Sequence, residues 1–219
     1  MELKGKKINF LGDSITQGCG TSDESKIFFN LLKKEEELAE ARGYGIGGTR
    51  IAHQEPVDFG EAFSVRYKEM DDDADVVVVF GGVNDYGHGK APMGDFSDKT
   101  VNTFYGACRV LIEGLIEKYP KSEIVFMTPL HCQKEENSEE KKERGTEFAW
   151  AAYPLKKYVE VIKEVCGYYA IPVLDLYSVS GIQPNVEIIK ELYCPDGLHP
   201  NDEGHIKIKN KLKAFLKNL

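Results

Sequence analysis

The sequence of 219 residues lacks the features that mark membrane-spanning, secreted and nucleic-acid-binding proteins. No apolar run approaches the roughly 20 residues that a helix needs to span a bilayer, and no apolar leader of the secretory type precedes the first predicted strand. Basic residues are not in excess, because 28 Lys and Arg stand against 36 Asp and Glu and the formal net charge is −8. We therefore expect a cytoplasmic protein that has neither a nucleic acid nor a membrane as partner.

Cysteine and histidine are also sparse. The chain has five cysteines, which are widely spaced and form no C-x-x-C pair, so we expect them to be reduced thiols. His53 and His88 have no acidic or cysteine partners at metal-ligand spacing, and we predict neither a metal site nor a cofactor. His205 falls within the last predicted helix and is expected on the surface of that helix.

The residues that are present have the composition of an ordinary globular protein, with 42% apolar and 29% charged residues. The length suits one domain with its own core, so residues 1–219 are assigned to a single domain. Strands are predicted at residues 7–11, 75–80, 124–128 and 172–176 and in a stretch ending near Gly45, and helices at residues 25–38, 101–116, 153–169 and 201–219. This alternation predicts an α/β fold in which a parallel sheet carries helices on both faces.

Several residues with useful chemistry come just after predicted strands. They are Ser14, Gly48, Asn84 and His131. In an open parallel sheet, ligands bind outside the carboxyl ends of the strands, so the topology gathers these residues at one edge. We expect His131 and Tyr86 to contribute to the wall of a substrate pocket there, and the alternative for each is ordinary packing.

Ser14, Asp196 and His199 together are the components of an ester-cleaving site. A serine hydroxyl is a poor nucleophile until a base takes its proton. His199 is the candidate base, and Asp196 in the same turn can hydrogen-bond to it and fix its tautomer. The alternatives are structural, because Ser14 could cap the helix that follows it and residues 195–197 have the composition of a surface turn.

A tetrahedral intermediate also needs fixed hydrogen-bond donors for its developing negative charge. Gly48 offers a backbone N–H that a substrate can approach closely, Asn84 offers a side-chain amide, and Ser14 offers its own N–H. The alternatives are again structural. Residues 81–85 could be a flexible loop, and residues 45–48 could be a tight turn between a strand and a helix.

These blocks together resemble the SGNH hydrolase superfamily, also called the GDSL-type esterases and lipases. The blocks are Gly-Asp-Ser-Ile at residues 12–15, Gly-Ile-Gly-Gly-Thr at 45–49, Gly-Val-Asn-Asp at 82–85 and Asp-Gly-Leu-His-Pro at 196–200. The resemblance spans residues 8–205 and implies that Ser14 is the nucleophile, Asp196 the acid and His199 the base. It implies that Gly48 and Asn84 are oxyanion donors.

The resemblance also implies a fold, a three-layer α/β/α sandwich on a five-stranded parallel sheet in the flavodoxin-like order 2-1-3-4-5. One position departs from the pattern of the family. The second block usually opens with an asparagine five residues before the oxyanion glycine, and Gly43 stands at that place. This departure leaves Gly47 as the alternative to Gly48.

The implied activity is that of a serine esterase or acylhydrolase working through an acyl-enzyme. The long segment at residues 134–147 is mostly charged, and it cannot usefully cover a fatty chain because burying charges is costly. We therefore expect a small acyl group, such as acetyl, on a water-soluble substrate such as a carbohydrate. A lipase, lysophospholipase or thioesterase on the same fold stays open, as does a non-catalytic flavodoxin-like protein that binds phosphate or flavin. A homo-oligomer is also left open.

Overall fold

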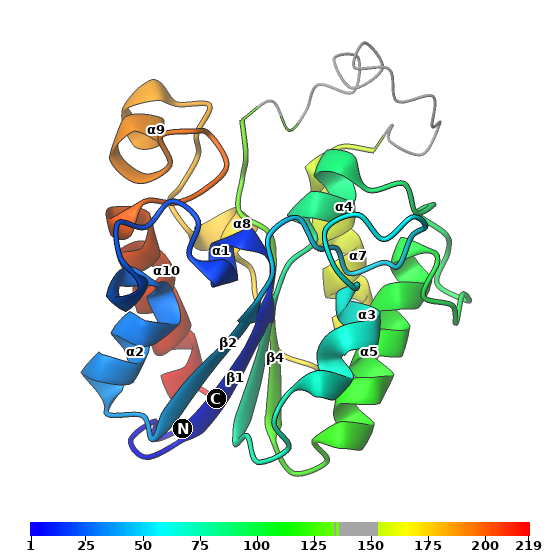
Figure 1. The fold of residues 1–219 in the computed structure, drawn as a ribbon, viewed down its shortest axis with the longest axis horizontal. Helices are drawn as coiled ribbons and strands as arrows, with labels where there is room; N and C mark the ends of the chain where they lie inside the picture. Colours follow the sequence, from blue (N-terminus) through cyan, green and yellow to red (C-terminus); the bar gives the residue numbers. More distant parts are fainter. Residues whose placement is uncertain (134, 136–152) are drawn as a thin grey trace.

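The computed structural model describes residues 1–133, 135 and 153–219, and within them the strands form one parallel sheet (Figure 1). The strands are β1 (Lys7–Gly12), β2 (Glu40–Gly45), β3 (Val76–Phe80), β4 (Glu123–Met127) and β5 (Val173–Leu174). Their order across the 5-stranded sheet is β2-β1-β3-β4-β5, which confirms the predicted fold class. The charged segment at residues 134–147 lies, apart from Glu135, outside the described residues.

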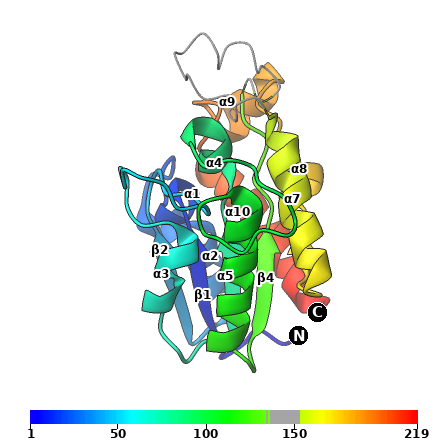
Figure 2. The same cartoon turned by 90° about the vertical axis from the view of Figure 1, so that its right-hand side faces the viewer.

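Helices cover both faces of the sheet (Figure 1). On one face lie α2 (Phe28–Glu36) and α10 (Asp202–Lys217), and on the other lie α3 (Phe63–Arg66), α5 (Phe104–Lys118) and α7 (Leu155–Tyr168). Figure 2 faces the second layer, where α5 and α7 pack side by side over the sheet. The central strand β3 is buried on both faces. Val76 and Val78 pack into the apolar core under α2 and α10, and Val77 and Val79 pack into the apolar core under α3, α5 and α7.

Short elements account for most of the differences from the predicted pattern. The predicted helix at residues 25–38 is a 3₁₀ turn, η1 (Glu24–Lys26), followed by α2, and the predicted strand at 172–176 ends early because α8 (Leu176–Val179) begins there. Asp175 caps α8 by accepting a hydrogen bond from the Ser178 N–H. The helix considered after Ser14 is α1 (Ser14–Gln17), whereas the sequence patterns missed α3, η2 (Tyr67–Glu69), α4 (Val83–His88) and α9 (Glu187–Tyr193). None of these missed elements is long enough to show a helical repeat.

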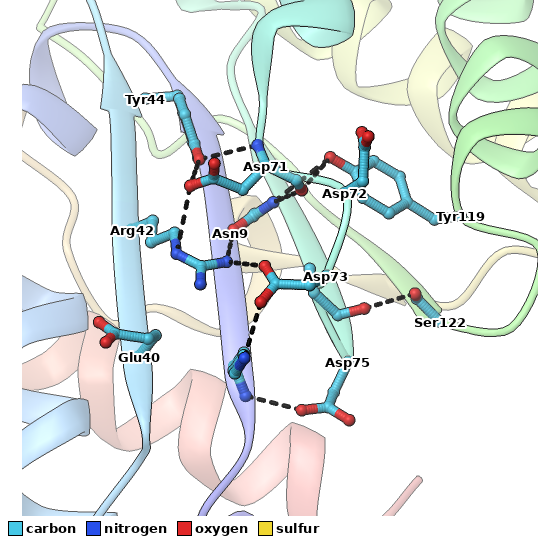
Figure 3. A network of polar contacts seen from close by, with 12 residues as sticks. Asn9, Glu40, Arg42, Tyr44, Asp71, Asp72, Asp73, Asp75, Tyr119 and Ser122 are labelled. Atoms are coloured by element: carbon cyan, nitrogen blue, oxygen red, sulfur yellow. Dashed lines mark hydrogen bonds and ion pairs between the residues drawn. The ribbon is translucent and has the colours of Figure 1, made fainter.

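The edge strand β2 is held by an acidic loop that leads into β3 (Figure 3). Arg42 of β2 forms ion pairs with Asp71 and Asp73, and the Tyr44 hydroxyl donates to Asp71. The buried Asn9 of β1 donates to the backbone oxygen of Asp71 at 2.8 Å, and Tyr119 donates to the same oxygen at 2.9 Å. Polar contacts to this loop therefore stabilise a strand whose own sequence has weak strand propensity.

His205 is not on the surface of α10, as the sequence pattern suggested, but fully buried. Its Nδ1 accepts a hydrogen bond of 3.1 Å from the Phe28 N–H, and its ring stacks on the Phe28 ring. Burial lowers the pKa of the imidazole from 6.5 to about 4 against a small opposing effect of Asp202. The error arose because His205 faces α2 from the other end of the chain, which no local pattern reveals.

None of the five cysteines is part of a disulfide. Cys19, beyond α1, is exposed, whereas the others are buried at Cys108, Cys132, Cys166 and Cys194. In the part of the chain that the structure describes, no helix combines the length and apolar character needed to cross a bilayer.

Candidate active site

The carboxyl ends of the strands bring distant parts of the chain together at one edge of the sheet. Ser14 opens α1 after β1, Asn84 lies in the first turn of α4 after β3, and His199 lies in the turn before α10. Figure 1 shows α1 and α4 at the same edge of the sheet. Ser14 Oγ lies 3.0 Å from His199 Nε2, although the two residues are 185 positions apart in the sequence.

A chain of hydrogen bonds continues from His199 to Asp196. His199 Nδ1 lies 2.7 Å from Asp196 Oδ2, while Asp196 Oδ1 accepts from the N–H groups of Leu198 and His199 at 2.8 and 2.7 Å. Burial would raise the pKa of Asp196, but these hydrogen bonds outweigh it and hold the pKa below its usual value. The ionised carboxylate therefore accepts the Nδ1 proton, which leaves Nε2 as the acceptor that faces the Ser14 hydroxyl.

The Ser14 hydroxyl is available because its neighbour caps the helix. Asp13 is the N-cap of α1, and its side chain accepts from the Ile15 N–H at 3.0 Å. Burial raises the pKa of Asp13 to about 6, against the Ile15 hydrogen bond and the electrostatic effects of His199 and Arg66. The N-cap of α1 is thus Asp13 and not Ser14, the residue considered for this role from the sequence.

The candidate oxyanion donors lie beside Ser14 but are engaged to different extents. Asn84 Nδ2 donates to the Thr49 oxygen at 2.9 Å, which uses one of the two amide hydrogens. The Gly47 N–H donates to Gln17 Oε1 at 2.7 Å, whereas the Gly48 N–H makes no hydrogen bond within the described residues. Gly48 therefore fits the role of a donor to substrate better than Gly47.

Gly48 also has to be a glycine for two local reasons. Its φ is +77°, in the left-handed region that residues with a Cβ rarely adopt. A Cβ at this position would lie 2.5 Å from the ring of Phe59, a residue that is 53% exposed. The close approach of Phe59 therefore places an apolar side chain directly beside the candidate oxyanion donor.

Asp85 ties the loop after β2 to the helix that carries Asn84. Its two carboxylate oxygens accept the N–H groups of Ile51 and Ala52, each at 2.9 Å. Burial raises the pKa of Asp85 to about 7, although these two N–H groups and Arg50 oppose the rise. These two hydrogen bonds hold the loop after β2 against α4, and they fix Gly48 and Asn84 relative to each other.

Arg66 is a second brace, and sequence analysis missed it. From α3, its guanidinium donates to the Gly12 oxygen at 2.5 Å, the Tyr44 oxygen at 2.7 Å and Thr49 Oγ1 at 3.2 Å. It thus joins the ends of β1 and β2 to the loop that carries Gly48. Burial lowers its pKa to about 10, against the opposing charges of Asp13 and Glu69. A lone arginine in a one-turn helix gave no sequence signal for this role.

The two predicted pocket-wall residues lie in different surroundings. His131 Nδ1 lies 2.5 Å from Oε1 of the buried Glu135, and its ring lies against Tyr177 with 3.8 Å between the ring centres. Tyr86 is 8% exposed and packs edge-on against Tyr158 in the core on the α7 side. The structure therefore brings His131 to the sheet edge and places Tyr86 within the apolar core under α3, α5 and α7.

A small pocket lies between the strand ends. Its free volume is about 10 Å³, which is room for roughly one water-sized sphere. It is lined by Asp13, Ile15, Phe80, Gly81, Val83, Pro129, Leu130, His131 and Leu198. Several of these residues directly precede or follow Ser14, Asn84 and His199, so the pocket lies next to the candidate site.

Among the described residues, no three or more His, Cys, Asp or Glu side chains are grouped so as to hold a metal ion.

A protein family and several solved structures are similar to this chain. A profile of the GDSL-like Lipase/Acylhydrolase family matches residues 10–206. A solved structure from Lactobacillus plantarum is 30% identical, with a TM-score of 0.82 over 98% of this chain and 98% of its own. An acetyl xylan esterase shares the fold at 20% identity and a TM-score of 0.61, covering 95% of this chain and 98% of its own. A two-domain esterase active on acetylated mannans also shares the fold, at 20% identity and a TM-score of 0.60, covering 97% of this chain and 48% of its own. No curated protein sequence is significantly similar to the chain.

Proposed function

Because the chain belongs to the GDSL-like lipase/acylhydrolase family, we propose that it is a serine esterase that removes a small acyl group from a water-soluble ester. The observation that carries this proposal is the chain of hydrogen bonds from Ser14 Oγ through His199 to Asp196, with distances of 3.0 and 2.7 Å. A protein that only binds phosphate or flavin has no need of an imidazole and a carboxylate aligned on a serine.

The proposed reaction begins with attack of Ser14 Oγ on the ester carbonyl while His199 Nε2 takes the hydroxyl proton. Asp196 stabilises the imidazolium that forms and keeps Nε2 directed at the serine. The tetrahedral intermediate collapses, the bond to the alcohol oxygen breaks, and His199 gives its proton to the departing alkoxide. Water then attacks the acyl-enzyme with His199 again as base, which releases the carboxylic acid and restores Ser14.

The negative charge on the carbonyl oxygen needs donors that are in place before the reaction. We assign this role to the N–H groups of Ser14 and Gly48 and to the second amide hydrogen of Asn84. The hydrogen bond from Asn84 to the Thr49 oxygen supports the assignment, because it fixes the amide plane while leaving one hydrogen for substrate. Asp85 and Arg66 act as positioning residues, since they hold the loops that carry these donors.

The proposed substrate class rests on the size of the pocket and on two structural neighbours. The pocket that Asp13 and Ile15, the neighbours of Ser14, help to line has a free volume of about 10 Å³, which suits the methyl of an acetyl group and is too small for a fatty chain. The acetyl xylan esterase and the esterase active on acetylated mannans have the same fold and act on acetylated carbohydrates. Acetylated sugars or oligosaccharides are therefore the substrates that we propose.

Replacement of the nucleophile tests the proposal. Ser14→Ala should abolish hydrolysis of p-nitrophenyl acetate and of an acetylated sugar while the far-ultraviolet circular dichroism is unchanged, because Ser14 supplies the covalent step and Asp13 caps the helix. Ser25→Ala, at an exposed serine, is the matched control and should keep wild-type activity. An organophosphonate should label Ser14. A label on another serine, or faster turnover of the palmitate than of the acetate, would count against the proposal.

A further inference from the structure

His131 is held in a fixed orientation by a buried carboxylate. Glu135 is 3% exposed, and its Oε1 accepts from His131 Nδ1 at 2.5 Å and from the Tyr177 hydroxyl at 3.3 Å. Its Oε2 accepts from the Cys132 N–H at 3.1 Å. With Tyr177 against one face of the ring and Glu135 on Nδ1, the imidazole cannot rotate freely. A buried carboxylate is costly unless it is well paired, so the cluster is built for a definite geometry.

The fixed imidazole forms part of the wall of the small pocket. Ile15, Val83 and Leu198 line the same pocket, and each is a sequence neighbour of a proposed catalytic or oxyanion residue. The segment that carries His131 is also joined to the turn of the proposed base, because the Gln133 N–H donates to the Gly197 oxygen at 2.7 Å. His131 is therefore fixed both in its own orientation and relative to His199.

The pocket has little space to spare. Its free volume of about 10 Å³ corresponds to roughly one water-sized sphere, which is close to the size of a methyl group. Its other walls are the strand ends and core side chains such as Phe80 and Leu130, which are 2% and 3% exposed. His131 differs from these walls because its side chain is 20% exposed and lies outside both apolar cores. A change at His131 can therefore enlarge the pocket without opening either core.

We propose that His131 determines acyl-chain specificity, by closing the pocket between the residues that flank Ser14, Asn84 and His199 so that an acetyl group fits and longer acyl chains do not. Glu135 and Tyr177 act through His131 as positioning residues. The proposal rests on the proposed esterase function and adds to it the residue that sets the length of the acyl group. It commits the site to short-chain acyl esters, whatever alcohol they carry.

The test measures kcat/KM for p-nitrophenyl acetate, butyrate and hexanoate. The decisive variant is His131→Asn, which shortens the side chain yet keeps a hydrogen-bonding partner for the buried Glu135. Wild-type protein should prefer acetate to butyrate by roughly tenfold or more, and His131→Asn should reduce that preference by about tenfold, mainly through faster turnover of butyrate. His131→Leu, which keeps the volume, should retain the preference for acetate.

Two further variants separate specificity from stability. Glu135→Gln keeps the shape but weakens the hold on the imidazole, and it should relax the preference for acetate less than His131→Asn does. His53→Ala is the matched control, because His53 pairs with Glu55 and Glu61 and lies outside this pocket. It should leave the acetate-to-butyrate ratio unchanged. A merely structural role of His131 would lower all three rates together and leave their ratios as in the wild type.

The outcomes distinguish this inference from the function on which it rests. If wild-type turnover does not depend on Ser14, the esterase proposal and this inference both fail. If turnover depends on Ser14 but folded His131→Asn keeps the wild-type ratio, this inference alone is overturned. If His131→Asn does not fold, the comparison passes to Glu135→Gln, and an acetate-to-butyrate ratio in that variant equal to the wild-type ratio overturns the inference.

Discussion

Asp13 and Ser14 are adjacent residues of similar capping ability, and the structure divides two tasks between them. Asp13 accepts the Ile15 N–H as N-cap, so the Ser14 hydroxyl is left to face His199. A cap on Ser14 itself would have tied up the oxygen that the proposed reaction uses. The order of these two residues is thus part of the proposed chemistry rather than a detail of helix termination.

Asn84 gives the first prediction at this scale. Asn84→Ala should lower kcat for acetyl esters by roughly 10²–10³ with a much smaller change in KM, because the lost amide donor acts mainly on the transition state. Steady-state kinetics with p-nitrophenyl acetate provide the measurement. Asn30→Ala, whose amide donates to the Glu24 backbone oxygen, is the control. An effect confined to KM would make Asn84 a residue of ground-state binding.

The buried His205 gives a prediction about pH. Its pKa is lowered from 6.5 to about 4 in the folded protein, so the unfolded chain binds more protons between these values. The contribution of His205 to stability is therefore present above pH 6.5 and is lost as the pH falls toward 4, by up to about 3 kcal/mol. His205→Asn, which can still accept the Phe28 N–H, should remove this part of the pH dependence.

The measurement is the free energy of unfolding in urea between pH 7 and pH 4 for both proteins. The comparison with the variant is needed because the raised pKa values of Asp13 and Asp85 act in the opposite direction over part of this range. Parallel curves for wild type and His205→Asn would show that His205 is protonated in the folded state and would refute the prediction.

Sequence analysis could find residues that stand in local sequence blocks, while their catalytic roles stay predictions. Ser14, Asp196 and His199 lie together as the blocks implied, and the strand ends explain why. It failed for Arg66 and for His205, because each acts through partners that only the folded chain brings near. Partners of this kind leave no periodic or motif signal in a single sequence.

At the scale of elements, long strands and helices were predictable and short ones were not. The valine run of β3 and the apolar stripe of α5 each bury many side chains in a repeating pattern, and both were found near their true bounds. The one-turn helix α8 is instead set by its Asp175 cap, and α3 is held by the long-range hydrogen bonds of Arg66. For β2, weak strand propensity is overcome by the ion pairs of Arg42 with the loop before β3.

The short helix α3 gives the prediction at this scale. Arg66→Met would leave the Gly12 and Tyr44 oxygens without their charged donor, and it should cost about 3 kcal/mol of unfolding free energy. Because the same guanidinium bonds Thr49, kcat should fall as well. Arg42→Met is the matched control at the partly exposed loop before β3, where we expect a loss of about 1 kcal/mol and little change in kcat.

Urea titration and steady-state kinetics of these two variants decide the matter. Equal losses of stability in Arg42→Met and Arg66→Met, with kcat unchanged in both, would mean that α3 does not position the oxyanion loop.

On the scale of the whole molecule, the sheet joins two apolar cores into one unit. Cys108 and Cys166 are buried in the core under α5 and α7, and Cys194 is buried in the core under α2 and α10. Because β3 contributes side chains to both cores, we expect both to open in one transition. Thiol labelling followed by mass spectrometry should modify Cys19 alone in native protein, and the thiols of both cores at the same urea concentration. Labelling of Cys194 at a clearly lower concentration would indicate two separate units.

The separation of 185 residues between Ser14 and His199 has a consequence during synthesis on the ribosome. At usual rates of translation, roughly 10–40 s pass between the emergence of the serine and that of the histidine. Throughout that interval the nascent polypeptide holds the proposed nucleophile, joined later by Asn84, but no base to activate it. Reactivity toward esters therefore arrives only with the last part of the domain, and incomplete translation products that stop before His199 should be inert toward cellular esters.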